Sequence, residues 1–207
     1  MTDERCKTIT WSRPWPRALP EDEIHLWRIP LTAETEPAAR RRLAHHALRA
    51  ILAHYLACDP EALRFEKAPG GKPRLASAAL NFNLSHSGDW GLVAVARRWA
   101  LGVDLERRRR VRRPLAIARR FFSPEARARL ARCAPEELEF TFLSLWTELE
   151  ARQKLSGAGL AGPWLAETAC HRLSFLLDAH HPASLSWPLE AGPSPGLRFF
   201  HFPERRE

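Results

Sequence analysis

Apolar and polar residues alternate along several short stretches of the chain, which is the pattern of strands with one buried face. We interpret as strands residues 24–29, 81–87, 92–96 and 99–106, and as weaker strand-like pieces 172–177, 183–187 and 197–202. Every second side chain of NFNLSHS (81–87) shares a face, so Phe82, Leu84 and His86 should face one way and Asn83, Ser85 and Ser87 the other. In WALGVDLE (99–106), Leu101, Val103 and Leu105 should face inward and Gly102, Asp104 and Glu106 outward.

Apolar residues at helical spacing predict two long helices. The first runs from about Pro37, which suits a first-turn position, to Cys58, and the second from about Pro135 to Ser156. Gly157 can end the second helix in the left-handed conformation. Shorter helices are expected at 115–122 and from Ser123 onward.

A helix followed by strands in each part of the chain predicts an α+β fold of two related halves, residues 1–106 and 107–207. The composition, 45% hydrophobic and 27% charged residues, is that of a globular protein. No apolar run approaches the roughly 18–20 residues of a membrane span, and the N-terminus lacks a secretory signal pattern. The four cysteines are scattered without metal-binding spacing, so we expect reduced thiols in a cytoplasmic protein with no membrane partner.

The net charge of +8 indicates an anionic partner, such as nucleic acid, a phosphorylated cofactor or an acidic protein. The run ERRRRVRR (106–113) fits a nucleic-acid patch or a solvated loop that faces an acidic partner. It lacks interleaved aromatic residues, and the chain has no recognised nucleic-acid motif, so we do not expect nucleic acid as the partner.

Asp104 and Glu106 stand two residues apart on a predicted strand, so both carboxylates leave the same face. At about 5 Å and an effective dielectric near 20, their repulsion is roughly 3 kcal/mol, which a bound cation would remove. An oxygen-rich site with few protein ligands suits magnesium. The alternative is a solvated strand end neutralised by the arginines at 107–110.

Trp146, Glu150 and Lys154 follow one another at spacings of four on the second long helix and share one stripe. Glu150 and Lys154 could form an ordinary helical ion pair, worth roughly 0.3–0.5 kcal/mol. Alternatively, Glu150 would be a third carboxylate for the same cation, and Lys154 a charge for a phosphate oxygen.

Two further segments carry polar groups of interest. Ser85, His86 and Ser87 could form a polar strand end or grip a phosphate; a hydrolase is disfavoured because no G-x-S-x-G elbow is present. Gly70-Gly71-Lys72-Pro73 is a turn with a lysine and lacks the frame of a P-loop.

Taken in order, the motifs GGKPRL, FNLSHSGDWGLVAVA, LGVDLE, ARRFFSPEA and FLSLWTELEARQKLSGAGL resemble those of the 4'-phosphopantetheinyl transferases of the Sfp type. The resemblance covers about residues 40–160. It implies an enzyme that moves the phosphopantetheine arm of coenzyme A onto a serine of an acyl or peptidyl carrier protein and releases 3',5'-ADP. It also implies a monomer of two α+β halves related by pseudo-two-fold symmetry, with coenzyme A and magnesium in the cleft between them.

Carried over position by position, the resemblance assigns roles to individual residues. Asp104, Glu106 and Glu150 would bind magnesium, and Glu150 would also take the serine proton, directly or through a metal-bound water. Lys154 would contact a coenzyme A phosphate and protonate the leaving group. The remaining contacts to coenzyme A would come from Ser85, His86, Lys72, Pro73 and Arg40.

Two departures from the family pattern stand out. Leu149 occupies the position, directly before the helix glutamate, where the family commonly has lysine. The chain also ends soon after residues 197–202, so we expect the sheet of the second half to lack an edge strand. These departures motivate an alternative function, a non-catalytic relative that binds coenzyme A or a carrier protein.

Overall fold

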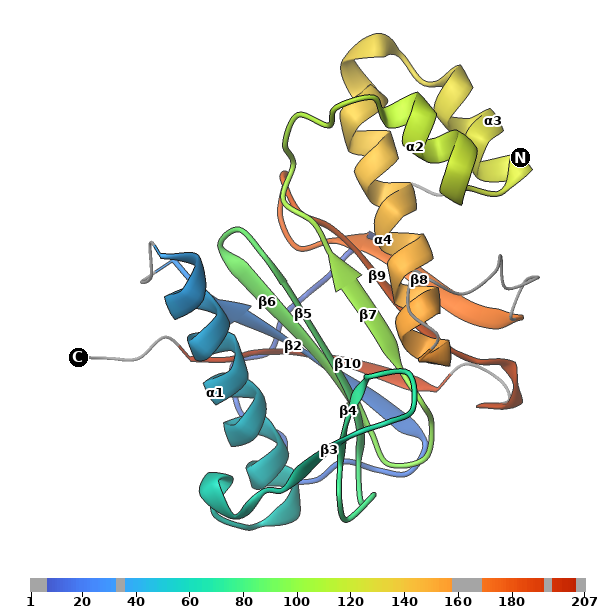
Figure 1. Cartoon of the computed structure of the whole chain (residues 1–207). Helices are drawn as coiled ribbons and strands as arrows, with labels where there is room; N and C mark the ends of the chain where they lie inside the picture. Colours follow the sequence, from blue (N-terminus) through green and yellow to red (C-terminus); the bar gives the residue numbers. More distant parts are fainter. Residues whose placement is uncertain (1–6, 33–35, 158–168, 192–194, 204–207) are drawn as a thin grey trace.

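The computed structural model describes residues 7–32, 36–157, 169–191 and 195–203 (Figure 1). The end of the last family motif (158–160) and residues 204–207 of the PERRE ending lie outside this part. The strands are β1 (Lys7–Thr8), β2 (Glu23–Pro30), β3 (Phe65–Lys67), β4 (Pro73–Leu75), β5 (Asn81–Ser87), β6 (Trp90–Ala96), β7 (Gly102–Leu105), β8 (Cys170–Leu176), β9 (Pro182–Pro188) and β10 (Gly196–His201). The α-helices are α1 (Pro37–Leu56), α2 (Pro114–Phe121), α3 (Pro124–Arg132) and α4 (Leu138–Ser156), with 3₁₀ turns at Pro60–Ala62, Pro135–Glu137 and Leu189–Ala191.

The mixed α+β architecture is confirmed, as are the predicted strands and long helices, with two larger differences in their bounds. The strand predicted at 99–106 is limited to 102–105, and the second long helix begins at Leu138, after a 3₁₀ turn at Pro135–Glu137. One sheet has the strand order β10-β2-β6-β5, and the other has the order β1-β8-β9-β7. The turn-rich stretch 68–73 connects β3 and β4 in a separate hairpin. Sequence reasoning missed the two strands of this hairpin because three residues are too few to display a period.

The two sheets pack face to face, and a long helix covers the outer face of each (Figure 1). Alternation along β2 produces this arrangement: Ile24 and Leu26 face the second sheet, whereas Trp27 and Ile29 face α1. The helix α4 lies against β7 and β9 on the far side of the second sheet. No helix in the described residues is long and apolar enough to cross a bilayer.

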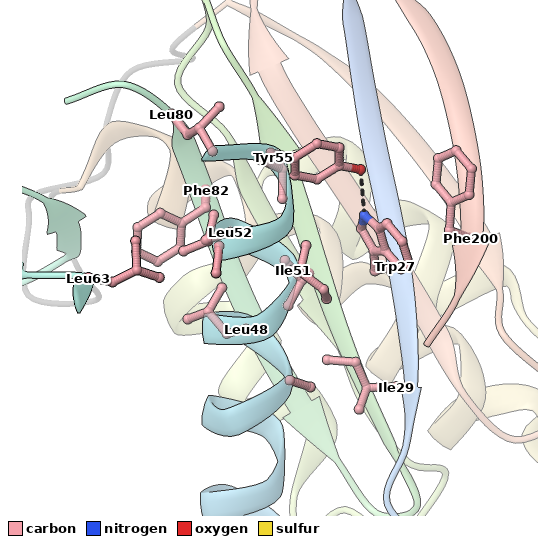
Figure 2. Packing of buried hydrophobic residues seen from close by; sticks show 14 of the residues in the cluster. Trp27, Ile29, Leu48, Ile51, Leu52, Tyr55, Leu63, Leu80, Phe82 and Phe200 are labelled. Atoms are coloured by element: carbon pink, nitrogen blue, oxygen red, sulfur yellow. Dashed lines mark hydrogen bonds between the residues drawn. The ribbon is translucent and has the colours of Figure 1, made fainter. Parts of the chain in front are cut away.

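The core between the first sheet and α1 is centred on Trp27, which is fully buried (Figure 2). Its indole stacks on Phe200 with ring centroids 4.9 Å apart, and its Nε1 donates to the Tyr55 hydroxyl at 2.9 Å. Ile51 and Leu52 fill the space between α1 and the strands. This core therefore joins residues from α1, β2 and the C-terminal strand β10.

The two sheets do not correspond to the two predicted halves of the chain, residues 1–106 and 107–207. β7, which precedes this point, pairs antiparallel with β9 in the second sheet. β10 pairs in parallel with β2 in the first sheet, and β1 pairs with β8 in the second. The division of the chain at 106–107 stays a prediction, but each sheet takes strands from both sides of it. The described edge strands of the second sheet are β7 and the two-residue strand β1.

Candidate active site

A row of polar side chains joins β5 of the first sheet to β7 of the second. Val103 N donates to Asn83 Oδ1 at 2.7 Å, and Ser85 Oγ donates to Asp104 Oδ1 at 2.7 Å. One step further, Ser87 Oγ donates to Glu106 Oε2 at 3.1 Å. We call this row (Asn83, Ser85, Ser87, Asp104 and Glu106) the polar seam. The predicted alternation of β5 is confirmed, because Phe82 and Leu84 pack on the α1 core on the opposite face.

Gly102 allows α4 to approach β7 closely enough to complete the site. A Cβ at this position would stand 1.8 Å from the carbonyl oxygen of Ala151 and 2.5 Å from the amide nitrogen of Leu155. Both contacts are backbone atoms, which cannot rotate away, so only glycine fits. The close approach brings the outward face of β7 under the helix stripe that carries Glu150 and Lys154.

The Lys154 ammonium lies on the seam at its most buried carboxylate. Its Nζ is 2.6 Å from Asp104 Oδ1 and 3.1 Å from Ser85 Oγ. Asp104 is only 5% exposed, and burial raises its pKa even though Lys154 and Ser85 oppose the shift. Lys154 pairs with Asp104 across the seam, and its charge also opposes the rise in the pKa of Glu150.

The other two acids lie within electrostatic reach of Asp104. The pKa of Glu106 is raised by burial and then by the Asp104 charge, although Arg109 stands 3.8 Å from its Oε1. The pKa of Glu150 is also raised by burial and then by Asp104, with a smaller contribution from Glu106. Two carboxylates from β7 and its end and a third from α4 therefore repel one another at one place.

Within the described residues, no three His, Cys, Asp or Glu side chains are close enough together to hold a metal ion. The donor set nevertheless suits a hard divalent cation, because all three groups are carboxylates whose charges disfavour one another. A cation already lies on the central carboxylate, namely the Lys154 ammonium. The metal site formed by the three carboxylates therefore stays a prediction. The chemistry of these residues is compatible with it.

A cavity of about 680 Å³ opens on the other face of β5, between this strand, α1 and the β3–β4 hairpin. It is lined by Arg41, His45, Leu48, Arg49, Phe65, Glu66, Lys67, Pro73, Phe82, Asn83, Leu84 and His86. His86 and Pro73, both predicted to contact coenzyme A, are among these residues. Arg41, Arg49 and Lys67 line the cavity together with one acid, Glu66, so its wall is electropositive. The pKa of His86 is lowered by burial and then by His45 and Arg41.

The helix α1 contributes to this cavity, and the contact of Arg40 with coenzyme A stays a prediction. Arg40 does not line the cavity; its Nη2 lies 3.0 Å from Asp89 Oδ1. The next residue, Arg41, does line it, together with His45 one turn later. Sequence reasoning missed Arg41 and His45, although their spacing of four on a predicted helix places both side chains on one face.

Lys72 lies beside the seam and not in this cavity. Its Nζ donates to the carbonyl oxygen of Leu101 at 2.5 Å, and burial, followed by the Lys154 charge, lowers its pKa to about 8. It lines a smaller cavity of about 220 Å³ with Arg74, Asn81 and Ser156. At Gly70, in the same turn, a Cβ would stand 1.6 Å from the Gly157 carbonyl oxygen, so the hairpin turn touches the end of α4.

Leu149, where the family commonly has lysine, is buried at 8% exposure. It belongs to a third apolar cluster formed by α2, α3 and the first part of α4, together with Val111, Phe122 and Phe142. In this chain, Leu149 therefore packs α4 against α2 and α3.

Comparison of the sequence with known proteins gives matches to one family. The model of the 4'-phosphopantetheinyl transferase superfamily matches residues 100–196. The 4'-phosphopantetheinyl transferase HetI of Nostoc sp. (strain PCC 7120) is 34% identical over 181 residues, which are 73% of this chain and 76% of that protein. The 4'-phosphopantetheinyl transferase Sfp of Bacillus subtilis (strain 168) is 32% identical over 130 residues, and AcpT of Escherichia coli (strain K12) is 35% identical over 129 residues. These two alignments span 56% and 63% of the respective relatives and 62% and 60% of this chain.

The chain belongs to the 4'-phosphopantetheinyl transferase superfamily. The aligned family model begins just before β7 and ends at the start of β10, so it includes Asp104, Glu106, Glu150 and Lys154.

Proposed function

We propose that this protein transfers the 4'-phosphopantetheine arm of coenzyme A to a serine of an apo acyl or peptidyl carrier protein and releases 3',5'-ADP. One observation carries this proposal: the single strand β5 separates an electropositive cavity from a group of three carboxylates and a lysine. His86 faces the cavity, and its neighbour Ser85 faces Asp104. A ligand with a phosphorylated nucleotide at one end and a pyrophosphate in the middle fits this arrangement. Its nucleotide would occupy the cavity, and its pyrophosphate would lie beside the carboxylates and the lysine.

Asp104, Glu106 and Glu150 would hold the magnesium ion, which supplies positive charge at the pyrophosphate when bound. Lys154 would turn its ammonium from Asp104 to a phosphate oxygen and protonate the leaving phosphate. Glu150, whose pKa is raised by burial, is suited to remove the proton of the attacking serine.

The cavity residues would hold the nucleotide part of coenzyme A. Arg41, His45 and His86 present cationic or hydrogen-bonding groups to it, and Pro73 adds an apolar wall. Ser85 contacts Lys154, and Lys72 lies within electrostatic reach of it, so both would lie beside the phosphates. Arg40, which pairs with Asp89, would reach the 3'-phosphate only by leaving that partner.

At the level of the whole molecule, we propose two α+β halves related by pseudo-two-fold symmetry, with the substrates in a cleft along the polar seam. The protein would act as a monomer in the cytoplasm. Its exposed arginines at 107–110 lie directly after Glu106 and suit an acidic carrier protein.

The direct test is to incubate the protein with coenzyme A, magnesium and several apo carrier proteins and to weigh the carriers by mass spectrometry. We expect one phosphopantetheine to be added to at least one carrier. Coenzyme A binding without a mass gain on any carrier would favour the non-catalytic alternative. Absence of both would contradict the proposal.

Replacing Asp104 should abolish transfer without unfolding the protein. Asp104→Asn keeps the shape and a partner for Ser85, but it removes the charge that orders Lys154 and would hold the metal. We expect kcat/KM to fall by a factor of about 10² to 10³ or more. The thermal midpoint should stay close to that of the wild type. Unchanged turnover would remove Asp104 from the site.

A further inference from the structure

Two backbone hydrogen bonds attach the chain after β7 to the first residue of β9 and to the turn that precedes it. Glu106 N donates to the carbonyl oxygen of Pro182 at 3.1 Å, and Arg108 N donates to that of His180 at 2.7 Å. The first bond continues the ladder between β7 and β9, whereas the second places Arg108, two residues after Glu106, against the turn of residues 177–181. None of the turn residues belongs to the polar seam.

The side chain of Asp178 holds the turn together with two backbone hydrogen bonds, from Leu177 N to the His181 carbonyl oxygen and from His181 N to the Asp178 carbonyl oxygen. Its Oδ1 accepts hydrogen bonds from His180 N at 2.7 Å and from His181 Nδ1 at 2.8 Å. Its Oδ2 accepts one from Trp90 Nε1 at 2.8 Å, and Trp90 begins β6. Burial opposes ionisation of Asp178, but these three donors outweigh it and hold its pKa below the usual range. One carboxylate thus links the turn to the first sheet.

His181 carries this link to the neighbouring turn between β5 and β6. It is 3% exposed, and its Nε2 faces Gly88, where a Cβ would lie 3.0 Å from Nε2 and 2.5 Å from Cδ of Arg107. Gly88 has a φ of +58° and directly follows Ser87. Ser87 Oγ in turn donates to Glu106 Oε2 at 3.1 Å and accepts from Arg107 N at 3.0 Å. The carboxylate of Glu106 is therefore held by Ser87, whose neighbour Gly88 packs against His181, and His181 is bonded to Asp178.

We propose that Asp178 is a positioning residue that, through His181 and Trp90, fixes Glu106 beside Asp104. The proposal rests on the proposed function in so far as Glu106 serves the transfer reaction. Asp178 does not touch the nucleotide cavity, so its loss should disturb Glu106 and leave coenzyme A binding unchanged.

The experiment compares Asp178→Ala with His180→Ala. The His180 side chain is exposed, and its substitution keeps the backbone N–H and carbonyl that shape the turn. In the ligand-free protein, we expect amide hydrogen exchange at Glu106 and Arg108 to become at least about tenfold faster in Asp178→Ala and to stay unchanged in His180→Ala. In the transfer assay, we expect Asp178→Ala to lower kcat about tenfold or more and to raise the magnesium concentration needed for half-maximal rate. The KM for coenzyme A should not change.

Exchange rates and a magnesium requirement equal to those of the wild type would overturn the proposal, even if the thermal midpoint fell. If Asp178→Ala does not fold, Asp178→Asn, which keeps one acceptor oxygen, should show the same two changes to a smaller degree, and their absence would likewise overturn it. The exchange measurement uses no substrate. If the wild type transfers nothing, the proposed function fails, while exchange still decides whether Asp178 holds Glu106.

Discussion

At the scale of single residues, Gly102 shows how strictly the site depends on close packing. Gly102→Ala would place a methyl group 1.8 Å from the Ala151 carbonyl oxygen, so α4 must move away from β7. We expect a loss of about 1–3 kcal/mol or more in the free energy of unfolding, measured with urea, and a fall in transfer rate because Lys154 and Glu150 move with the helix.

Gly91 provides the matched control for this substitution, because it also lies in a buried strand. A Cβ there would make ordinary contacts with Ile29, the nearest at 3.4 Å. Gly91→Ala should therefore change the unfolding free energy much less. Equal losses in the two variants would refute the steric explanation for Gly102.

The raised pKa values of Asp104, Glu106 and Glu150 also predict how magnesium should act on stability. A carboxyl with a raised pKa in the folded state stabilises the fold at low pH, and this contribution is lost as the pH rises through the raised value. Near pH 7 the three charges repel, so a bound divalent ion should raise the thermal midpoint. Near pH 5, where protons compete for the same oxygens, the increase should be smaller.

The measurement is a thermal melt with and without magnesium at both pH values, with Asp104→Asn as the control that should abolish the increase. An increase of the same size at both pH values, or in Asp104→Asn, would contradict this explanation.

At the scale of elements, α4 serves two purposes at once: one stripe carries Glu150 and Lys154, and another packs into the bundle with α2 and α3. We expect Leu149→Ala to lower the free energy of unfolding by about 2–5 kcal/mol, as for other buried leucines. Leu149→Lys should destabilise at least as much and should not increase the transfer rate. Urea unfolding and steady-state kinetics measure both, and Leu115→Ala, at a 48% exposed position of α2, should have little effect on stability.

The elements also show how far the sequence determines the structure. The faces of β5 and β7 were predictable because alternation is a local property, and Ser85 and Asp104 consequently lie where that alternation places them. The burial of Leu149 was not predictable, because it depends on where α2 and α3 pack. The pairing of Lys154 with Asp104 likewise requires knowledge of how closely α4 approaches β7.

At the scale of the whole molecule, each sheet contains strands from both sides of residue 106, and this determines which parts of the chain can fold alone. A fragment of residues 1–106 would contain β7 without its partner β9 and β2 without β10. Trp27 would also lose the stacking of Phe200. We expect this fragment to show no cooperative thermal unfolding, whereas the full chain should. A sharp unfolding transition in the fragment would mean that the first half is an independent domain.

The polar seam has a thermodynamic consequence, because the groups that join the two sheets are also those offered to a ligand. Ser85, Asp104 and Lys154 contact one another across the boundary between β5 and the layer of β7 and α4. If binding at these groups tightens the junction, linkage requires that loosening the junction weakens binding by the same free energy. A ligand that bridges these groups should therefore raise the stability of the junction between the two sheets by the same free energy by which the closed junction favours binding.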